Sequence, residues 1–187
     1  MQLKPRTYDV AGLPPRYFNP GELEALLCLY ESVSPRVIVE FGVNTGRNPL
    51  AAFRNIRTID RYVGIDVLPG YVPKMRVQKR EVPPAPGELA QHDLRFELIL
   101  SPRGTFDLSA KDLPACDAVF IDGDHSQEAV RNDYALACSI VRPGGIIIFH
   151  DDNGSPAVEV TQTLNEFCKA GAQIKHVAGT WLSFERR

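Results

Sequence analysis

The sequence lacks the features that mark several large classes of protein. No apolar run approaches the length of a membrane-spanning helix, and the first residues lack the apolar core of a signal peptide. The net charge of −2 does not indicate a general nucleic-acid or membrane surface. Four cysteines are present without a C-x-x-C pair or metal-type spacing: Cys28, Cys116, Cys138 and Cys168. These absences predict a cytoplasmic protein with reduced thiols, those at 28, 138 and 168 being packed in helices.

Two familiar phosphate-binding motifs are also missing. The chain has neither G-x-G-x-x-G, which marks a dinucleotide site, nor the G-x-x-x-x-G-K-[ST] of a P-loop. Instead, residues 37–46 read VIVEFGVNTG, in which a β-branched run ends in Glu40 and leads into Gly42-x-x-x-Gly46. A carboxylate just before the first glycine would repel a phosphate but attract an ammonium group. The loop therefore favours a nucleoside that carries a positive charge.

A second carboxylate completes this pattern. About twenty residues beyond Gly46, the strand-like segment YVGID ends in Asp66. A strand, a glycine turn, a helix and a second strand tipped by an acid form a Rossmann-type nucleoside site, where the acid accepts hydrogen bonds from the ribose hydroxyls. S-adenosylmethionine joins an adenosine to a sulfonium, an ammonium group and a carboxylate suited to a helix N-terminus. The alternative is a glycine-rich turn without a ligand.

The same residues resemble the first motif, E-x-G-x-x-x-G, of the class I S-adenosylmethionine-dependent methyltransferases. The resemblance implies a set of cofactor-binding residues: Glu40, Gly42, Asn44, Gly46, Asp66 and Asp122. Related enzymes often carry an acid after the third strand that approaches the adenine amine. Thr105 stands near that position here, and Asp107 lies two residues further on. Phe106 can stack on the base or pack in the core, so the adenine contacts are left open.

Strands alternate with helices along most of the chain. The patterns predict strands at 36–41, 61–66, 95–100, 117–122 and 146–150, helices at 21–34, near Pro49, at 126–141 and at 157–170, and a hairpin of 174–177 and 181–185. This order predicts an α/β fold of the Rossmann-like class I methyltransferase type: a seven-stranded, mostly parallel sheet, helices on both faces and an antiparallel C-terminal hairpin. The length predicts one domain over residues 1–187, with residues 1–20 as an N-terminal arm.

Two clusters of acids follow strands that should be neighbours. Asp122 and Asp124 follow one strand, and Asp151 and Asp152 follow the next. Both clusters then lie at the carboxyl edge of the sheet, where ligands bind in open α/β folds. Converging carboxylates repel one another unless a cation separates them, and Mg²⁺ prefers oxygen ligands. The pattern therefore predicts a divalent metal site.

The segments FIDGDHS and FHDDN resemble the macrocin-type sugar O-methyltransferases and, more distantly, the catechol O-methyltransferases. The resemblance implies Mg²⁺ ligands at Asp122, Asp151 and Asp152 and a general base at Asp124; His125 is the other candidate base. The metal would lower the pKa of an acceptor hydroxyl, the base would take its proton, and the oxygen would attack the sulfonium methyl.

Structural roles for these residues remain open. Asp124 and Ser126 can cap the helix that follows them, and residues 151–154 can form a turn with Ser155 capping the last helix. His150 is expected to be packed or hydrogen-bonded rather than a metal ligand. Residues 69–86 contain five prolines and should be irregular, as a solvated loop or as part of a lid or acceptor site.

The leading hypothesis is an S-adenosylmethionine-dependent methyltransferase that modifies a small-molecule hydroxyl with the help of a divalent metal. The alternatives are a metal-independent N-methyltransferase, a non-catalytic nucleoside-binding module, and an enzyme that uses the same scaffold for hydroxylation. The chain has no long insert to cover a substrate. The acceptor site should therefore draw on the arm, the proline-rich loop and a partner subunit, which favours a homodimer.

Overall fold

The fold is built on one twisted sheet of seven strands. A computed structural model describes residues 7–14, 19–79 and 81–187. The strands run in the order β3-β2-β1-β4-β5-β7-β6. Their bounds are β1 Val37–Phe41, β2 Arg61–Val67, β3 Phe96–Ser101, β4 Cys116–Ile121, β5 Val141–Phe149, β6 Lys175–His176 and β7 Ser183–Arg186. Strands β1 to β5 are parallel, and β7 pairs antiparallel with both β5 and β6. The predicted fold is confirmed.

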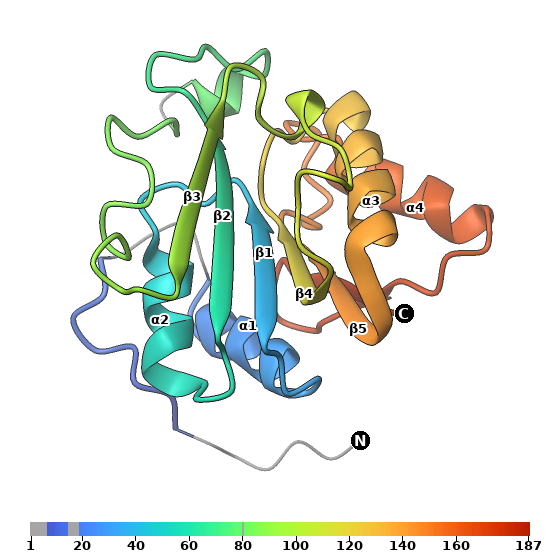
Figure 1. Ribbon diagram of the computed structural model, residues 1–187. Coiled ribbons are helices and arrows are strands. Elements are labelled where there is room, and N and C mark those ends of the chain that lie inside the picture. Colours follow the sequence, from blue (N-terminus) through green and yellow to red (C-terminus); the bar gives the residue numbers. More distant parts are fainter. Residues whose placement is uncertain (1–6, 15–18, 80) are drawn as a thin grey trace.

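Helices cover both faces of the sheet (Figure 1). One core contains side chains of α1 (Glu22–Glu31) and α2 (Arg47–Asn55) with Ile38 and Phe120 of the sheet. The other contains side chains of α3 (Gln127–Ile140) and α4 (Val160–Lys169) with Val39 and Val119. Neighbouring residues of one strand thus enter opposite cores, as the alternation of side chains in a strand requires. This double burial explains the continuous apolar runs of the strands.

Strand β5 begins earlier than the pattern predicts. Residues 142–145 were expected to end a helix, but Val141 pairs with Cys116 and the strand continues through a shift in register. Gly145 makes this path possible, because a Cβ there would lie 2.6 Å from Val141 Cγ1 and 2.7 Å from the Asp117 carbonyl oxygen. The glycine therefore serves close strand contact rather than a turn.

The structure confirms the predicted cap of α3 and corrects the predicted cap of α4. Ser126 caps α3, since its side chain accepts a hydrogen bond from the Ala129 N–H. Helix α4 begins at Val160 rather than near residue 157, and its N-cap is Glu159. Ser155 instead accepts a hydrogen bond from the Ala157 N–H within the preceding turn, so its predicted cap on α4 is wrong.

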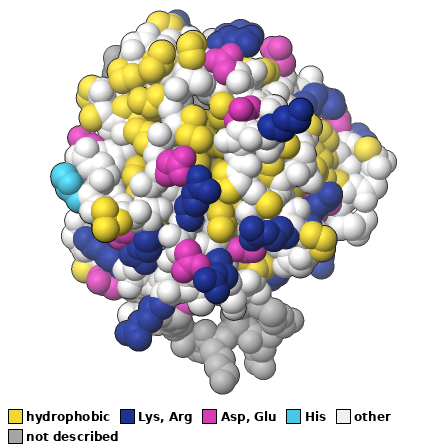
Figure 2. Space-filling model, in the orientation of Figure 1, with side chains coloured by type: hydrophobic (Ala, Val, Ile, Leu, Met, Phe, Trp, Pro, Cys, Tyr) yellow, Lys and Arg dark blue, Asp and Glu magenta, His cyan; other side chains and the backbone are white. Residues whose placement is uncertain are grey.

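The thiols are free, but they are not all packed. Cys116 is buried, Cys28 and Cys138 are half-buried, and Cys168 is exposed, which corrects the prediction for this last residue. Within the described part of the chain, every helix is too short or too polar to cross a bilayer. Basic and acidic side chains are interspersed on the face shown in Figure 2, and hydrophobic groups gather toward its upper part.

Part of the predicted N-terminal arm docks on the first two helices. The Tyr8 hydroxyl donates a hydrogen bond to Glu31 of α1, at 2.8 Å. The Asp9 N–H donates to the Asn55 side chain at the end of α2, at 2.7 Å. Val10 and Leu13 pack against the same core. Residues 1–6 and 15–18 of the arm lie outside the described residues.

The turn after β1 depends on Gly42. Its φ is +86°, and a Cβ there would lie 2.2 Å from the Asp122 carbonyl oxygen. We expect Gly42→Ala to lower the free energy of unfolding by on the order of 3 kcal/mol, since a backbone clash adds to the left-handed strain. Urea denaturation measures this loss.

Gly179→Ala is the matched control. Gly179 has a φ of +80°, and a Cβ there would meet no atom within 4 Å. Alanine at this position therefore has the same left-handed backbone strain as alanine at position 42, but no steric clash. We expect a loss of about 1–2 kcal/mol there. Equal losses in the two variants would contradict the close approach of Gly42 to Asp122.

Candidate functional site

A cavity lies at the carboxyl ends of β1, β2 and β4, where the strand order reverses. Open α/β sheets bind ligands at such a reversal. Among the predicted site residues, the cavity is lined by Gly42, Asn44, Asp66, Asp122 and Asp124.

The glycine loop folds over the end of β2. The N–H groups of Gly42 and Val43 donate to the Ile65 carbonyl oxygen, at 2.8 and 3.1 Å. The Asp66 carboxylate then accepts hydrogen bonds from the N–H groups of Asn44 and Val67, at 2.7 and 2.8 Å. These bonds fix the carboxylate in the cavity wall, where its remaining lone pairs can accept hydroxyl donors.

Glu40 and Gly46 lie behind the lining of this cavity. The Glu40 side chain is fully buried and accepts hydrogen bonds from Asn48 Nδ2 and the Tyr62 hydroxyl, at 2.6 and 2.9 Å. Burial and the nearby Glu40 charge raise the pKa of Tyr62. A Cβ on Gly46 would lie 3.0 Å from the Gly87 carbonyl oxygen. The structure thus gives both residues a role in supporting the loop.

The proline-rich loop forms one wall of the cavity. Besides the short 3₁₀ turn η1 (Arg76–Gln78), this segment is irregular, as predicted. Gln78 is buried, and its side-chain amide joins the loop to the segment after β4. Nε2 donates a hydrogen bond to the Gly123 carbonyl at 2.8 Å, and Oε1 accepts one from the His125 N–H at 3.1 Å. Sequence reasoning missed Gln78, because a lone glutamine among prolines has no motif.

A second cavity adjoins the first. It is lined by Val77, Asp122, His125, Asp151 and Trp181, among others. Asp122 also lines the first cavity, so the two spaces meet at its side chain. The arrangement provides two neighbouring ligand spaces with a carboxylate at their junction.

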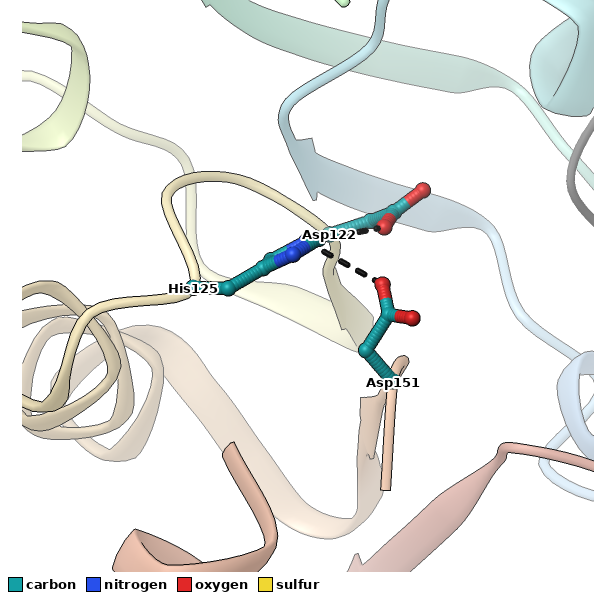
Figure 3. Close-up of side chains that lie close together, drawn as sticks. All are labelled: Asp122, His125 and Asp151. Atoms are coloured by element: carbon teal, nitrogen blue, oxygen red, sulfur yellow. Dashed lines mark ion pairs between the residues drawn. The ribbon is translucent and has the colours of Figure 1, made fainter. Parts of the chain in front are cut away.

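Asp122, His125 and Asp151 converge at this junction from the loops after β4 and β5 (Figure 3). His125 Nε2 lies 3.2 Å from Asp151 Oδ2 and 3.8 Å from Asp122 Oδ1. One donor atom from each residue lies within 4.8 Å of the other two. The backbone of Asp151 has a φ of +58°, a left-handed conformation that aspartate and asparagine tolerate better than most residues. This triad has the spacing of a metal site.

Asp152 does not join the triad. Its carboxylate accepts a hydrogen bond from Ser183 Oγ at 2.5 Å and lies 3.3 Å from His176 Nδ1. Asp151 lines the second cavity and Asp152 does not, so only one of the two acids faces it. His125 takes the place that the sequence analysis gave to Asp152. Asp124, the other predicted base, accepts a hydrogen bond from the Ser126 N–H at 2.8 Å.

His150 supplies positive charge to the two acids. Its Nδ1 lies 3.1 Å from Asp122 Oδ1 and 2.9 Å from Asp151 Oδ2, and its Nε2 lies 3.7 Å from Glu22 Oε1. Burial alone would lower the pKa of His150, but the carboxylates outweigh it and raise this pKa to about 10. The raised pKa favours the charged, imidazolium form of His150. It is hydrogen-bonded, in agreement with expectation.

The pKa of His125 is also raised. Burial opposes the charged form, while the nearby carboxylates of Asp122 and Asp151 favour it. His125 Nε2 is buried and makes no hydrogen bond of good geometry within the described part of the chain. Such a nitrogen, beside two carboxylates, is suited to bind a metal ion or to accept a proton once it is neutral.

A further acid, Asp133 of α3, lies in the wall of the first cavity. It is 2% exposed and accepts hydrogen bonds on Oδ1 from the Thr105 hydroxyl and from Asn132 Nδ2. Burial raises the pKa of Asp133 to about 7, with a smaller contribution from the charge of Asp124. Asp107, by contrast, is exposed and paired with Arg103. Sequence reasoning missed Asp133, since an acid within a helix normally faces solvent.

Asp133 should make stability depend on pH. Its pKa is 3.8 in the unfolded chain and about 7 in the fold, so the folded state holds a proton that the unfolded state has released. We expect stability to fall as pH rises between these values, by up to about 1.4 kcal/mol per unit. Asp133→Asn should lose this component. Urea unfolding from pH 4 to 7 tests it: parallel curves for the two proteins would contradict the raised pKa.

Comparisons with known proteins agree with this geometry. The family model described as "Methyltransferase domain" matches residues 39–151, more than half of the chain. No curated protein matches the sequence significantly. Similar solved structures include a cofactor-bound protein from MTB, with 20% identity, a TM-score of 0.65, and coverage of 94% of this chain and 84% of that one.

Two other similar structures contain named ligands. An O-methyltransferase from Bacillus cereus in complex with SAH has 19% identity, a TM-score of 0.61, and coverage of 95% of this chain and 86% of that one. The O-methyltransferase TomG from Streptomyces achromogenes, in complex with SAM, has 17% identity, a TM-score of 0.60, and coverage of 93% and 81%. At these identities, the likeness establishes the fold. The family match covers more than half of the chain and shows that this chain belongs to the methyltransferase-domain family and is an enzyme.

Proposed function

We propose that the protein transfers a methyl group from S-adenosylmethionine to a hydroxyl of a small molecule. The observation that carries this proposal is the junction of two cavities at Asp122, with Asp66 in one and the Asp122–His125–Asp151 triad facing the other. The donor occupies the first cavity and the acceptor the second. The similar O-methyltransferase structures that contain SAH or SAM support the choice of donor and of oxygen chemistry.

The first cavity suits the nucleoside part of the donor. The Asp66 carboxylate accepts hydrogen bonds from the ribose hydroxyls, while Gly42 and Asn44 line the path toward Asp122. The absence of a side chain at Gly42 lets the turn pack directly against the Asp122 backbone, which brings the two ends of this path together. The sulfonium then lies toward the carboxylates at the junction, which stabilise its positive charge.

The second cavity suits an acceptor with an apolar body and a hydroxyl group. Val77, Val158 and Trp181 contribute apolar wall, and His125 and Asp151 contribute polar groups. An apolar wall with a few convergent polar groups is the usual design of a small-molecule site. This asymmetry orients the hydroxyl toward the triad and the apolar body away from it.

The reaction needs one proton transfer and one displacement. In its neutral form, His125 Nε2 takes the proton of the acceptor hydroxyl. The oxygen attacks the methyl carbon, a C–O bond forms as the C–S bond breaks, and the products are a methyl ether and the neutral thioether S-adenosylhomocysteine. Because the donor carries its own leaving group, the protein contributes alignment and exclusion of water. The raised pKa of His125 makes this role effective only at higher pH.

The triad also fits a divalent metal ion. Asp122, His125 and Asp151 would hold it, and the buried Nε2 without a good hydrogen bond is suited to be a ligand. An ion bound there supplies Lewis acidity that lowers the pKa of the acceptor hydroxyl. One imidazole beside two carboxylates moves the preference from Mg²⁺ toward ions such as Mn²⁺. With His125 engaged, Asp124 is the remaining candidate base.

A metal-independent transfer, to oxygen or nitrogen, is the second candidate. The observation that favours it is the position of His150, whose Nδ1 lies 3.1 Å from Asp122 Oδ1 and 2.9 Å from Asp151 Oδ2. The raised pKa of His150 favours a charged ring, which offsets part of the negative charge of the two acids. The repulsion between Asp122 and Asp151 therefore does not require a metal. In this mode, His125 acts as the base.

Cofactor binding tests the first part of the proposal. We expect Asp66→Ala to weaken the binding of S-adenosylhomocysteine by about 100-fold or more, because two hydrogen bonds to a carboxylate are lost. Asp60→Ala is the matched control, since Asp60 precedes the same strand at its far end and pairs with Arg36 on the surface. Calorimetric titration measures both. An unchanged affinity of Asp66→Ala for S-adenosylhomocysteine would contradict the assignment of the nucleoside site to this cavity.

Metal binding distinguishes the two modes. After treatment with EDTA, we expect the protein to bind Mn²⁺, measured by loss of the free-ion electron paramagnetic resonance signal. Asp151→Asn should abolish this binding, and asparagine suits the left-handed backbone there. Asp152→Asn, the same change one residue on, should retain it. Wild-type protein that binds no Mn²⁺ would favour the metal-independent mode.

A further inference from the structure

The proline-rich loop contributes to the walls of both cavities. Gln78 and Val82 line the first cavity, Val77 lines the second, and Glu81 lines both. We infer that Gln78 is a positioning residue that transmits occupancy of the first cavity to the acceptor wall of the second. The inference rests on the proposed function, in which the first cavity holds the donor and the second the acceptor.

The first link fastens the loop to the glycine turn beside the donor. Asn44 lines the first cavity, and its Nδ2 donates a hydrogen bond to the Glu81 carbonyl oxygen. The Asn44 carbonyl oxygen accepts a hydrogen bond from the Gly87 N–H, at 2.6 Å. The Asn44 N–H donates to the Asp66 carboxylate, at 2.7 Å. A donor bound at Asp66 therefore restrains the residue that holds the loop.

The second link is Gln78 itself, which is 5% exposed. Its side-chain amide donates to the Gly123 carbonyl oxygen and accepts from the His125 N–H, at 2.8 and 3.1 Å. Its backbone carbonyl oxygen accepts a hydrogen bond from the Glu81 N–H, at 3.0 Å, so this turn also includes the contact to Asn44. Loss of either amide bond leaves a buried polar group without its partner, which is costly.

The third link leads from His125 to the acceptor wall. The Glu159 N–H donates to the His125 carbonyl oxygen, at 3.0 Å. Glu159 directly follows Ala157 and Val158, which line the second cavity. The His125 backbone is thus bound to Gln78 on one side and to the acceptor wall on the other, while its ring faces the triad carboxylates. A shift of this backbone moves the ring and the wall together.

The loop has the low local stability that such a link requires. Apart from η1 it is irregular, and three of its apolar side chains are largely exposed: Leu68 by 43%, Val72 by 72% and Val77 by 46%. A segment with few buried apolar contacts opens locally at low cost. A ligand that packs beneath Gln78 makes opening rarer, so donor binding and the closed arrangement favour each other.

The test is amide hydrogen exchange, followed by NMR with and without S-adenosylhomocysteine. The Asn44 N–H reports the first cavity, and the Glu159 N–H reports the acceptor wall. The Ala172 N–H, bonded to the Phe167 carbonyl oxygen near the far end of α4, is the reference. In the wild type, we expect the ligand to slow exchange at Asn44 and Glu159 by about fivefold or more, and to leave Ala172 unchanged.

Gln78→Met keeps the length of the side chain and removes both hydrogen bonds. We expect the ligand still to slow exchange at Asn44, but to change exchange at Glu159 by less than about twofold. Gln127→Met is the matched control, because the Gln127 side chain joins α3 to Glu166 of α4 and lines neither cavity. It should keep the wild-type responses. Each protein is compared with itself, so a general loss of stability cancels.

Three results would overturn the inference. A wild type in which the ligand slows exchange at Asn44 but not at Glu159 would refute the link and leave the proposed function intact. A response at Glu159 in Gln78→Met equal to that of the wild type would assign Gln78 a structural role only. A wild type that shows neither response, and no heat of binding in calorimetry, would refute the donor site and the inference together.

A second variant covers the case in which Gln78→Met does not fold. Gln78→Glu keeps an oxygen that accepts the His125 N–H, but an ionised carboxylate has no proton to donate to the Gly123 carbonyl oxygen. We expect the slowing at Glu159 to fall by about twofold or more, because one of the two bonds is lost. An unchanged response at Glu159 in this variant would contradict the role of the bond to Gly123.

Discussion

The close packing of two carboxylates with two imidazoles, those of His125 and His150, is the interaction on which the rest of the site depends. Asp122 and Asp151 project from adjacent parallel strands, and burial makes their mutual repulsion costly. His150, the residue directly after β5, lies between the two carboxylates and Glu22 of α1, which is near the opposite side of its ring. The contact between Glu22 and His150 therefore links α1 to the carboxyl edge of the sheet, where the site lies. His125 completes the cluster from the cavity side.

Backbone packing places this cluster beside the first cavity. The turn after β1 fits against the backbone of Asp122 only because Gly42 has no side chain. Gln78 then binds the proline-rich loop to the segment that carries His125. Neither contact involves the reacting atoms. Both nevertheless set the distance between the two cavities, and a one-ångström error in such a distance weakens catalysis strongly.

The sequence predicted the fold well because its signals are local. β-branched runs, glycine turns and helix periods alternate along the chain, and parallel order follows from that alternation. The paired carboxylates near the sheet edge were recognisable for the same reason, since strand ends meet there. The sequence did not reveal which of Asp151 and Asp152 turns inward. That outcome depends on a left-handed backbone at Asp151 and on Ser183 of a strand far along the chain.

Contacts between distant segments were beyond sequence reasoning. Gln78 and Asp133 have no motif, and their roles arise only when the proline-rich loop and α3 close over the same cavity. Glu40 carries the motif, yet Tyr62 and Asn48 enclose it below the loop. Glu40, which belongs to a recognisable motif, thus lies beneath the lining of the cavity. Gln78 and Asp133, which belong to no motif, form part of the lining itself.

The position of Asp122 in both cavities makes the site sensitive to the charge of its ligand. In the proposed reaction, the sulfonium adds a positive charge beside a carboxylate that already lies close to two histidines, and the thioether product carries no charge. Any change that the donor makes in the affinity of the second cavity for the acceptor must be matched by an equal effect of the acceptor on donor affinity. Under the proposed function, electrostatics at Asp122 favours the charged donor over its neutral product. Product release and acceptor entry are then parts of one thermodynamic cycle.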